Sequence, residues 1–164
     1  MKKIYIIITL LFICFLLTGC GIKTTNCSLN NKQSNYEINT NYSIYSKEGI
    51  VKNIKINQMI KSNDKKVLKE FEKQISNQYE YNNRLYGGYK YSIKISEKEL
   101  NSNVIINYSK IDMEKFVKDN AAMKEYVNNK NQLTLEGIKK LYRSTGAKCE
   151  WKKSMNKIHW FFNN

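Results

Sequence analysis

Cysteine is the residue type in this sequence with the widest choice of covalent chemistry. Three copies, Cys14, Cys20 and Cys27, lie near the start of the chain, and Cys149 lies near its other end. A thiol can be acylated, oxidised to a disulfide or bound to a metal ion. The segment around each cysteine indicates which of these reactions to expect.

Residues 1–19 have the layout of a secretory signal peptide. Lys2 and Lys3 form a short positive start, and the run from Ile4 to Leu17 is apolar except for Thr9. This run is shorter than the roughly 20 apolar residues that a membrane-spanning helix needs. We therefore expect residues 1–19, which include Cys14, to be removed on maturation.

The end of this segment, Leu17-Thr18-Gly19-Cys20, resembles the bacterial lipobox. The resemblance implies cleavage before Cys20 and attachment of a diacylglycerol, with acyl chains such as palmitate, to its sulfur. Two acyl chains anchor a protein stably, whereas one binds a membrane only reversibly. The alternative is an uncleaved anchor with an incidental cysteine. We expect a protein held by Cys20 at the extracytoplasmic face of the cell membrane, with residues 20–26 as a lipidated tether.

Cys27 and Cys149 are then the only thiols of the exported domain. Oxidising compartments permit disulfides, so a bridge between the two ends of the domain is the simplest prediction. Two free thiols or two metal ligands are the alternatives. A metal site would need further ligands, and His159 is the only histidine.

Several residue patterns formally match catalytic motifs. Ser62 to Lys65 has the Ser-x-x-Lys spacing of penicillin-recognising enzymes, but the same spacing recurs from Ser154 to Lys157 and the companion motifs are absent. A serine triad would have to use His159, in the terminal extension. Four carboxylates stand among lysines at helical spacing, which favours solvated ion pairs: Glu70, Glu72, Asp112 and Glu114. We predict no catalytic residue, metal site or cofactor, and no enzyme.

The chain is strongly basic, and loss of Lys2 and Lys3 with the signal lowers its formal net charge only from +14 to +12. Basic composition often indicates nucleic acid, but an exported domain would not meet it. Attraction to anionic lipid head groups or wall polymers is a better use of the charge. A well solvated surface, unrelated to any partner, is the alternative.

The hydrophobic period predicts strands and then helices. Apolar residues alternate with polar ones over 36–44, 50–60, 89–95 and 104–108, as in an antiparallel sheet with one wet face. Helical stripes cover Asp64 to about Tyr81, Asp112 to about Val127, and a helix after Thr134 that stops near Gly146. Ser62 or Asn63 is the expected cap of the first of these helices. A first strand around Cys27 and a last one with Cys149 complete the pattern.

The predicted fold class is α+β over residues 27–151, with helices packed on one face of a mainly antiparallel sheet. The expected order is three strands, a helix, two strands, two helices and a strand. Residues 152–164 form a basic and aromatic extension, which suits either a membrane contact or a frayed end.

The segment Val104 to Val127, "VIINYSKIDMEKFVKDNAAMKEYV", and the following "LTLEGIKKLYRSTGAKC" resemble the C-terminal half of the YehR-like lipoproteins, a family with a domain of unknown function. The resemblance implies an exported single-domain lipoprotein with an α+β fold. It implies no activity and no site residues. The extension after Cys149 departs from the family's pattern.

The sequence therefore predicts a membrane-anchored, non-catalytic binding module at the cell envelope, with a protein or an envelope component as partner. A solute-binding lipoprotein that serves a transporter is the alternative, and a small envelope hydrolase is a third reading. The alternative needs a pocket among the tyrosines, most of which are expected in the core. These tyrosines are Tyr36, Tyr42, Tyr79, Tyr86, Tyr89, Tyr91 and Tyr108.

Overall fold

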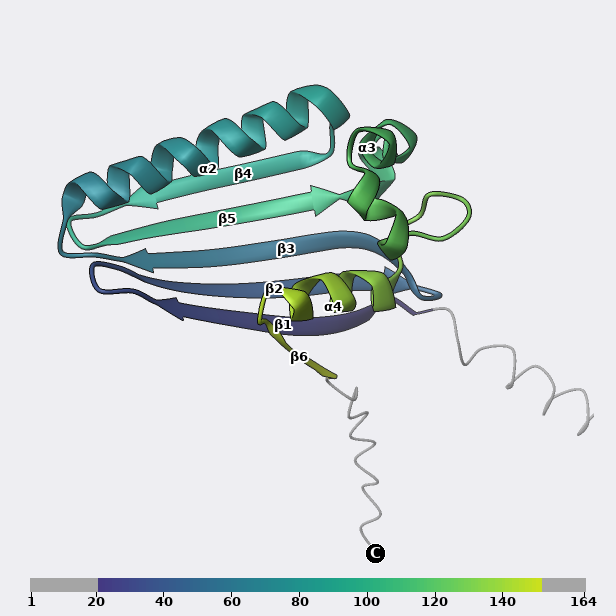
Figure 1. Ribbon diagram of the computed structural model, residues 1–164, viewed down its shortest axis with the longest axis horizontal. Helices are drawn as coiled ribbons and strands as arrows, with labels where there is room; N and C mark the ends of the chain where they lie inside the picture. Colours follow the sequence, from purple (N-terminus) through teal and green to yellow (C-terminus); the bar gives the residue numbers. More distant parts are fainter. Residues whose placement is uncertain (1–20, 152–164) are drawn as a thin grey trace, which may run out of the picture.

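The computed structural model describes residues 21–151, which form one open sheet and the helices that cover it (Figure 1). The strands are β1 (Lys23–Lys32), β2 (Glu37–Lys47), β3 (Ile50–Lys61), β4 (Tyr89–Ile95), β5 (Glu99–Asn107) and β6 (Lys148–Trp151). The helices are α2 (Lys65–Tyr86), α3 (Met113–Asp119) and α4 (Leu135–Ser144), with 3-10 turns η1 (Tyr108–Lys110) and η2 (Ala121–Tyr126). No helix within residues 21–151 is long and apolar enough to cross a membrane.

The sheet has the strand order β4-β5-β3-β2-β1-β6, and all neighbouring strands are antiparallel. β1, β2 and β3 form a meander, β5 returns beside β3, and β6 adds to the free edge of β1. The first and the last described strands are therefore neighbours. The predicted α+β class, order of elements and antiparallel sheet are confirmed.

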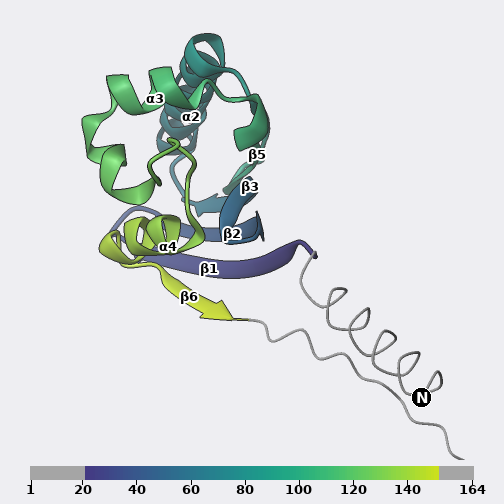
Figure 2. The same cartoon turned by 90° about the vertical axis from the view of Figure 1, so that its right-hand side faces the viewer.

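The two faces of the sheet differ because side chains alternate along each strand. α2, α3 and α4 all lie on one side of the sheet, which is seen from its end in Figure 2. This inner face carries Ile44, Ile54 and Val104, which are at most 1% exposed. No described helix or strand covers the outer face, to which their sequence neighbours point.

Two helices close the inner face from opposite ends of the strand order. Leu68 of α2 packs on Ile60 of β3 and Leu100 of β5. Ile138 of α4 packs in a second cluster that includes Ile44 and other residues of β1, β2 and β3. Full burial of such a side chain contributes about 1.5–3 kcal/mol. These contacts explain the apolar stripes that predict the two helices.

α2 differs from its prediction at both ends. Its N-cap is Asp64, whose carboxylate accepts a hydrogen bond from the backbone N–H of Lys66, so neither Ser62 nor Asn63 is the cap. The helix continues to Tyr86 because its last turn is still apolar enough to pack on the sheet. Gly88 then adopts a φ of 80°, and a Cβ there would lie 2.7 Å from the carbonyl oxygen of Asn107. Only glycine allows β4 to begin so close to β5.

The helix predicted from Asp112 to about Val127 is two shorter pieces. Asp112 is the N-cap, as expected, but α3 ends at Asp119, and the side chain of Asn120 donates to the carbonyl oxygen of Phe116. The backbone N–H of Asn120 donates to the same oxygen, so Asn120 caps the end of α3 with both groups. The chain continues as η2, and the predicted helix after Thr134 is present with its cap.

Two strand boundaries also differ from the prediction. β1 begins at Lys23, so residues 23–26, assigned to the tether from sequence, pair with β2 and belong to the sheet. Thr25 is 1% exposed, and its burial explains why the strand starts before Cys27. At the end of β5, Tyr108 lies in η1 and not in the strand, because Asn107 caps that turn by accepting from the N–H of Ser109.

Candidate functional site

Cys27 and Cys149 form a disulfide, with an S–S distance of 2.04 Å. The two residues are register partners on β1 and β6, and Cys27 is 2% exposed. The predicted bridge is therefore present. It occupies both sulfurs, which excludes the alternatives of two free thiols or two metal ligands.

Other predicted features lie outside the described residues. These are the signal peptide, the lipidation site Cys20, the Ser154 to Lys157 pair, His159 and the extension 152–164. Lipidation and the role of the extension stay predictions.

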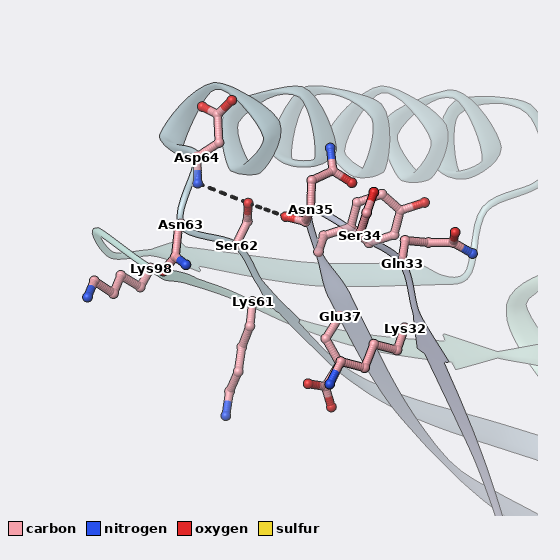
Figure 3. Close-up of a pocket in the computed structure, with 11 residues that line it drawn as sticks. Lys32, Gln33, Ser34, Asn35, Glu37, Lys61, Ser62, Asn63, Asp64 and Lys98 are labelled. Carbon is pink, nitrogen blue, oxygen red and sulfur yellow. Dashed lines mark hydrogen bonds between the residues drawn. The ribbon is translucent and has the colours of Figure 1, made fainter.

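Ser62 is at the edge of a hollow of about 600 Å³, formed by the β1–β2 turn, the start of α2 and Lys98 of the β4–β5 turn (Figure 3). The residue is only 7% exposed, and its hydroxyl makes two hydrogen bonds. The hydroxyl donates to the carbonyl oxygen of Asn35 at 2.7 Å and accepts from the backbone N–H of Asp64 at 3.0 Å. Ser62 therefore ties the β1–β2 turn to the start of α2, which explains the serine without a catalytic role.

The hollow is lined by charges of both signs. Lys32, Lys61 and Lys98 line it together with Glu37 and Asp64, and in Figure 3 the Asp64 carboxylate points away from the lysines. A hydrogen bond from Asn39 lowers the pKa of Glu37, and Asn30 and the lysines Lys32 and Lys61 lower it further. The hollow is open and hydrated, so these charges stabilise one another only weakly.

The four carboxylates considered for acid–base chemistry lie on two helices. Glu70 and Glu72 belong to α2, whereas Asp112 caps α3 and Glu114 is in its first turn. The Asp112 carboxylate accepts from the backbone N–H of Lys115 at 3.0 Å. Acidic groups at these positions stabilise the start of a helix, which accounts for Asp112 and Glu114.

Most of the tyrosines pack between the sheet and the helices. Tyr42 of β2 stacks on Tyr142 of α4 with ring centroids 4.1 Å apart, and Tyr79 of α2 lies over Tyr89 and Tyr91 of β4. The same region holds the other predicted members: Tyr36 against Phe71, Tyr86 against Phe116, and Tyr108 between two core clusters. Their packing agrees with the predicted core role.

Burial changes the acidity of these phenols. It raises the pKa of Tyr89 to about 12, and raises the pKa values of Tyr108 and Tyr142 as well. The neighbouring phenols contribute in the same direction because each would be repelled by the charge of another. The hydroxyls therefore stay protonated and act as neutral hydrogen-bonding groups throughout the physiological pH range.

The outer face was not predicted as a site, although its polar positions are visible in the sequence. Register places Ser28, Asn41, Asn57, Asn103 and Ser92 side by side across β1, β2, β3, β5 and β4. Alternation alone predicts that these side chains are polar and exposed. It cannot show that they form one row, because that requires the strand order and the pairing of each strand.

An open antiparallel sheet, helices on one face and a disulfide between its first and last strands define the class of fold. No family model and no curated protein matches the sequence. Among solved structures, the NMR structure of the YehR protein of Escherichia coli is similar, with a TM-score of 0.52 and 13% identity over 87% of this chain and 100% of that chain. The NMR structure of a protein from Streptococcus pneumoniae TIGR4 has a TM-score of 0.46 and 18% identity, over 79% and 86% of the two chains.

The fold of this chain is YehR-like, which confirms at the level of fold the resemblance seen from Val104 onward. At this identity the likeness concerns the fold alone.

Proposed function

We propose that the protein is a lipoprotein, anchored through Cys20 to the extracytoplasmic face of the cell membrane, and that it acts there as a non-catalytic binding or interaction module. The observation that carries the proposal is the one-sided sheet. Its inner face is covered by helices, while its outer face is left uncovered by the described elements (Figure 2). A broad exposed face suits binding better than catalysis, which needs converging groups in a recess.

The disulfide supports an extracytoplasmic location. Cys27 and Cys149 are bridged, and disulfides persist in oxidising compartments but are rare where thiols are kept reduced. The bridge is consistent with the signal sequence of residues 1–19.

The start of β1 supports close contact with the membrane. Only Gly21 and Ile22 separate Cys20 from the first strand residue, Lys23. A lipid on Cys20 would hold the sheet directly above the head groups, where each nearby lysine gains about 1 kcal/mol from anionic lipid.

Fractionation of cells that carry Cys20→Ala tests the anchor. We expect the variant to leave the membrane fraction or to keep its signal peptide, because the lipid cannot be attached. Cys14→Ala, in the part of the signal that is removed, is the matched control and should behave as the wild type. A Cys20→Ala protein that stays in the membrane at the processed mass would contradict the proposal.

One observation favours the alternative of a solute-binding lipoprotein. Tyr42, Tyr79, Tyr108 and Tyr142 come from four elements, each is only half-buried, and they meet on the inner face. Native mass spectrometry of the protein purified from its own cells tests this reading. A small molecule retained by the wild type and lost from Tyr142→Ala would support it, and a ligand-free wild type would count against it.

A further inference from the structure

The asparagines of the three central strands all lie on one face. β2, β3 and β5 carry seven of them, and every one alternates with an inner-face residue: Asn39, Asn41, Asn53, Asn57, Asn101, Asn103 and Asn107. Asparagine is among the residues that strands disfavour, whereas threonine, valine and tyrosine fit an exposed strand well. Local propensity therefore does not account for this face, and departures of that kind concentrate where a protein functions.

The central row is continuous across the sheet. Asn41, Asn57 and Asn103 are successive register partners on β2, β3 and β5, and Ser28 and Ser92 extend the row on either side. Neighbouring strands are about 4.8 Å apart, so successive polar side chains of the row follow one another at about this spacing. Each carboxamide offers two donors and one acceptor.

The row lies between two shallow hollows of the outer face. One, of about 130 Å³, borders Asn41, Asn57 and Asn103, and the other, of about 370 Å³, borders Ser28 and Asn41. Asn41, Asn103, Ser28 and Ser92 are themselves exposed, so their polar groups are free to meet a ligand that lies on the sheet.

Lysines flank the row at both ends. Lys148 of β6 is the register partner of Ser28, while Lys90 and Lys94 stand on either side of Ser92 on β4. The outer face carries seven lysines against three glutamates, at register positions Lys32, Lys47, Lys55, Lys61, Lys90, Lys94 and Lys148, and Glu37, Glu99 and Glu150. This excess of positive charge attracts an anionic partner.

We propose that the outer face binds an extended, anionic glycan, which lies across the strands along the row from Ser28 to Ser92. The inference rests on the proposed envelope location, where such polymers occur. The step of the row is close to the length of one sugar unit in an extended chain, so successive hydroxyl or N-acetyl groups meet successive carboxamides. The carboxylates or other acidic groups of the glycan pair with Lys148, Lys90 and Lys94.

Other partners fit this face less well. A membrane contact needs inserted apolar side chains, and the outer face carries few of them: Ile105, which is 46% exposed, and half-buried Met59 and Tyr45. The core of a protein interface is rich in aromatic residues, and the row has none. A hydroxyl-rich polymer is the partner whose chemistry matches a row of carboxamides.

Fluorescence anisotropy with labelled oligosaccharides tests the proposal on the purified full chain in detergent micelles. The probes are a hyaluronan decasaccharide, which is carboxylated and N-acetylated, and a neutral dextran of the same length. We expect hyaluronan to bind at least tenfold more tightly than dextran. The triple variant Asn41→Thr/Asn57→Thr/Asn103→Thr should bind it at least tenfold more weakly than the wild type, while its thermal midpoint is unchanged or higher because threonine suits strands.

Two exposed asparagines outside the sheet provide the matched control. Asn77→Thr/Asn129→Thr changes one residue of α2 and one of the loop before α4, and should leave the affinity for hyaluronan unchanged. Equal binding by the triple variant and the wild type, or no hyaluronan binding at all, would overturn the inference. So would binding to phosphatidylglycerol vesicles that depends on the same three asparagines while hyaluronan does not bind. None of these results touches the Cys20→Ala test, so the anchor and the glycan site can fail separately.

Discussion

The inner and outer faces of this sheet are built from the same strands, but the inner face is packed against helices and the outer face is exposed to solvent. Ile54 and Lys55 are sequence neighbours on β3, yet Ile54 is 0% exposed and Lys55 points to solvent. The inner face is filled by side chains from α2 and α4, so its residues are constrained by volume. The outer face packs against no described element, so its residues are not constrained by packing.

Stability therefore depends mainly on one face of the sheet, and the surface offered to a partner lies on the other. A change on the inner face disturbs the fold, and through it everything else. A change on the outer face alters the surface and leaves the fold in place.

The largest effect should come from the bridge that joins β6, at one edge of the sheet, to its neighbour β1. Cys27→Ala/Cys149→Ala removes a crosslink between residues 122 positions apart. In the chain-entropy model this lowers the free energy of unfolding by up to about 4–5 kcal/mol. Urea unfolding followed by circular dichroism measures it, and a loss below about 1 kcal/mol would show that β6 adds little to the fold.

Ile54→Ala and Lys55→Ala compare the two faces most directly. The first leaves a cavity in the core and should cost about 3 kcal/mol, within the range for such truncations. The second removes an exposed side chain and should change stability by less than about 0.5 kcal/mol. The same urea experiment compares them, and equal losses would mean that the outer face is also packed.

Alkaline pH should weaken the inner face selectively. The pKa of Tyr89 is raised to about 12 by burial, so above the unfolded value of about 10 its phenol ionises more readily in the unfolded chain. Its contribution is fully present below pH 10 and is lost as the pH rises to 12, on the order of 2 kcal/mol. Urea midpoints measured from pH 8 to 12 should fall less steeply for Tyr89→Phe, and parallel curves would contradict this assignment.

Ser62→Ala should lower the free energy of unfolding by less than the loss of the bridge or of the Ile54 side chain. It removes two hydrogen bonds between the β1–β2 turn and the start of α2, worth about 1–2 kcal/mol in a buried site. Asn63→Ala, an exposed neighbour at the same hollow, is the matched control. Equal stability of Ser62→Ala and the wild type would leave the burial of this hydroxyl unexplained.

The sequence predicts the inner face well because burial leaves a periodic signal. The alternation that ends in Ile60 and the stripe that includes Leu68 predict a strand and a helix that do pack on each other. The disulfide was predictable from the expected export of the domain, which would leave Cys27 and Cys149 as its only two thiols. Neither inference requires knowledge of the pairing between strands.

The ends of the helices and strands, and the row of polar side chains across the outer face, were not predictable from the hydrophobic period. The break at Asn120 depends on a side-chain bond to Phe116, and the start of β1 at Lys23 depends on its pairing with β2. The row through Asn57 depends on the register of four strand pairs. The last two features arise from contacts between distant parts of the chain, so a local pattern cannot show them. The break at Asn120 is local, but the stripe of apolar residues continues past it and does not mark it.

The position of β6 has a consequence for the order in which the chain can fold. β1 is made first and meets β2 early, but its other edge stays unpaired until Lys148–Trp151 emerges. Until then this edge, with the thiol of Cys27 beside it, is open to pairing with the wrong strand or the wrong cysteine. The sheet is therefore completed and crosslinked only when the last strand has been made.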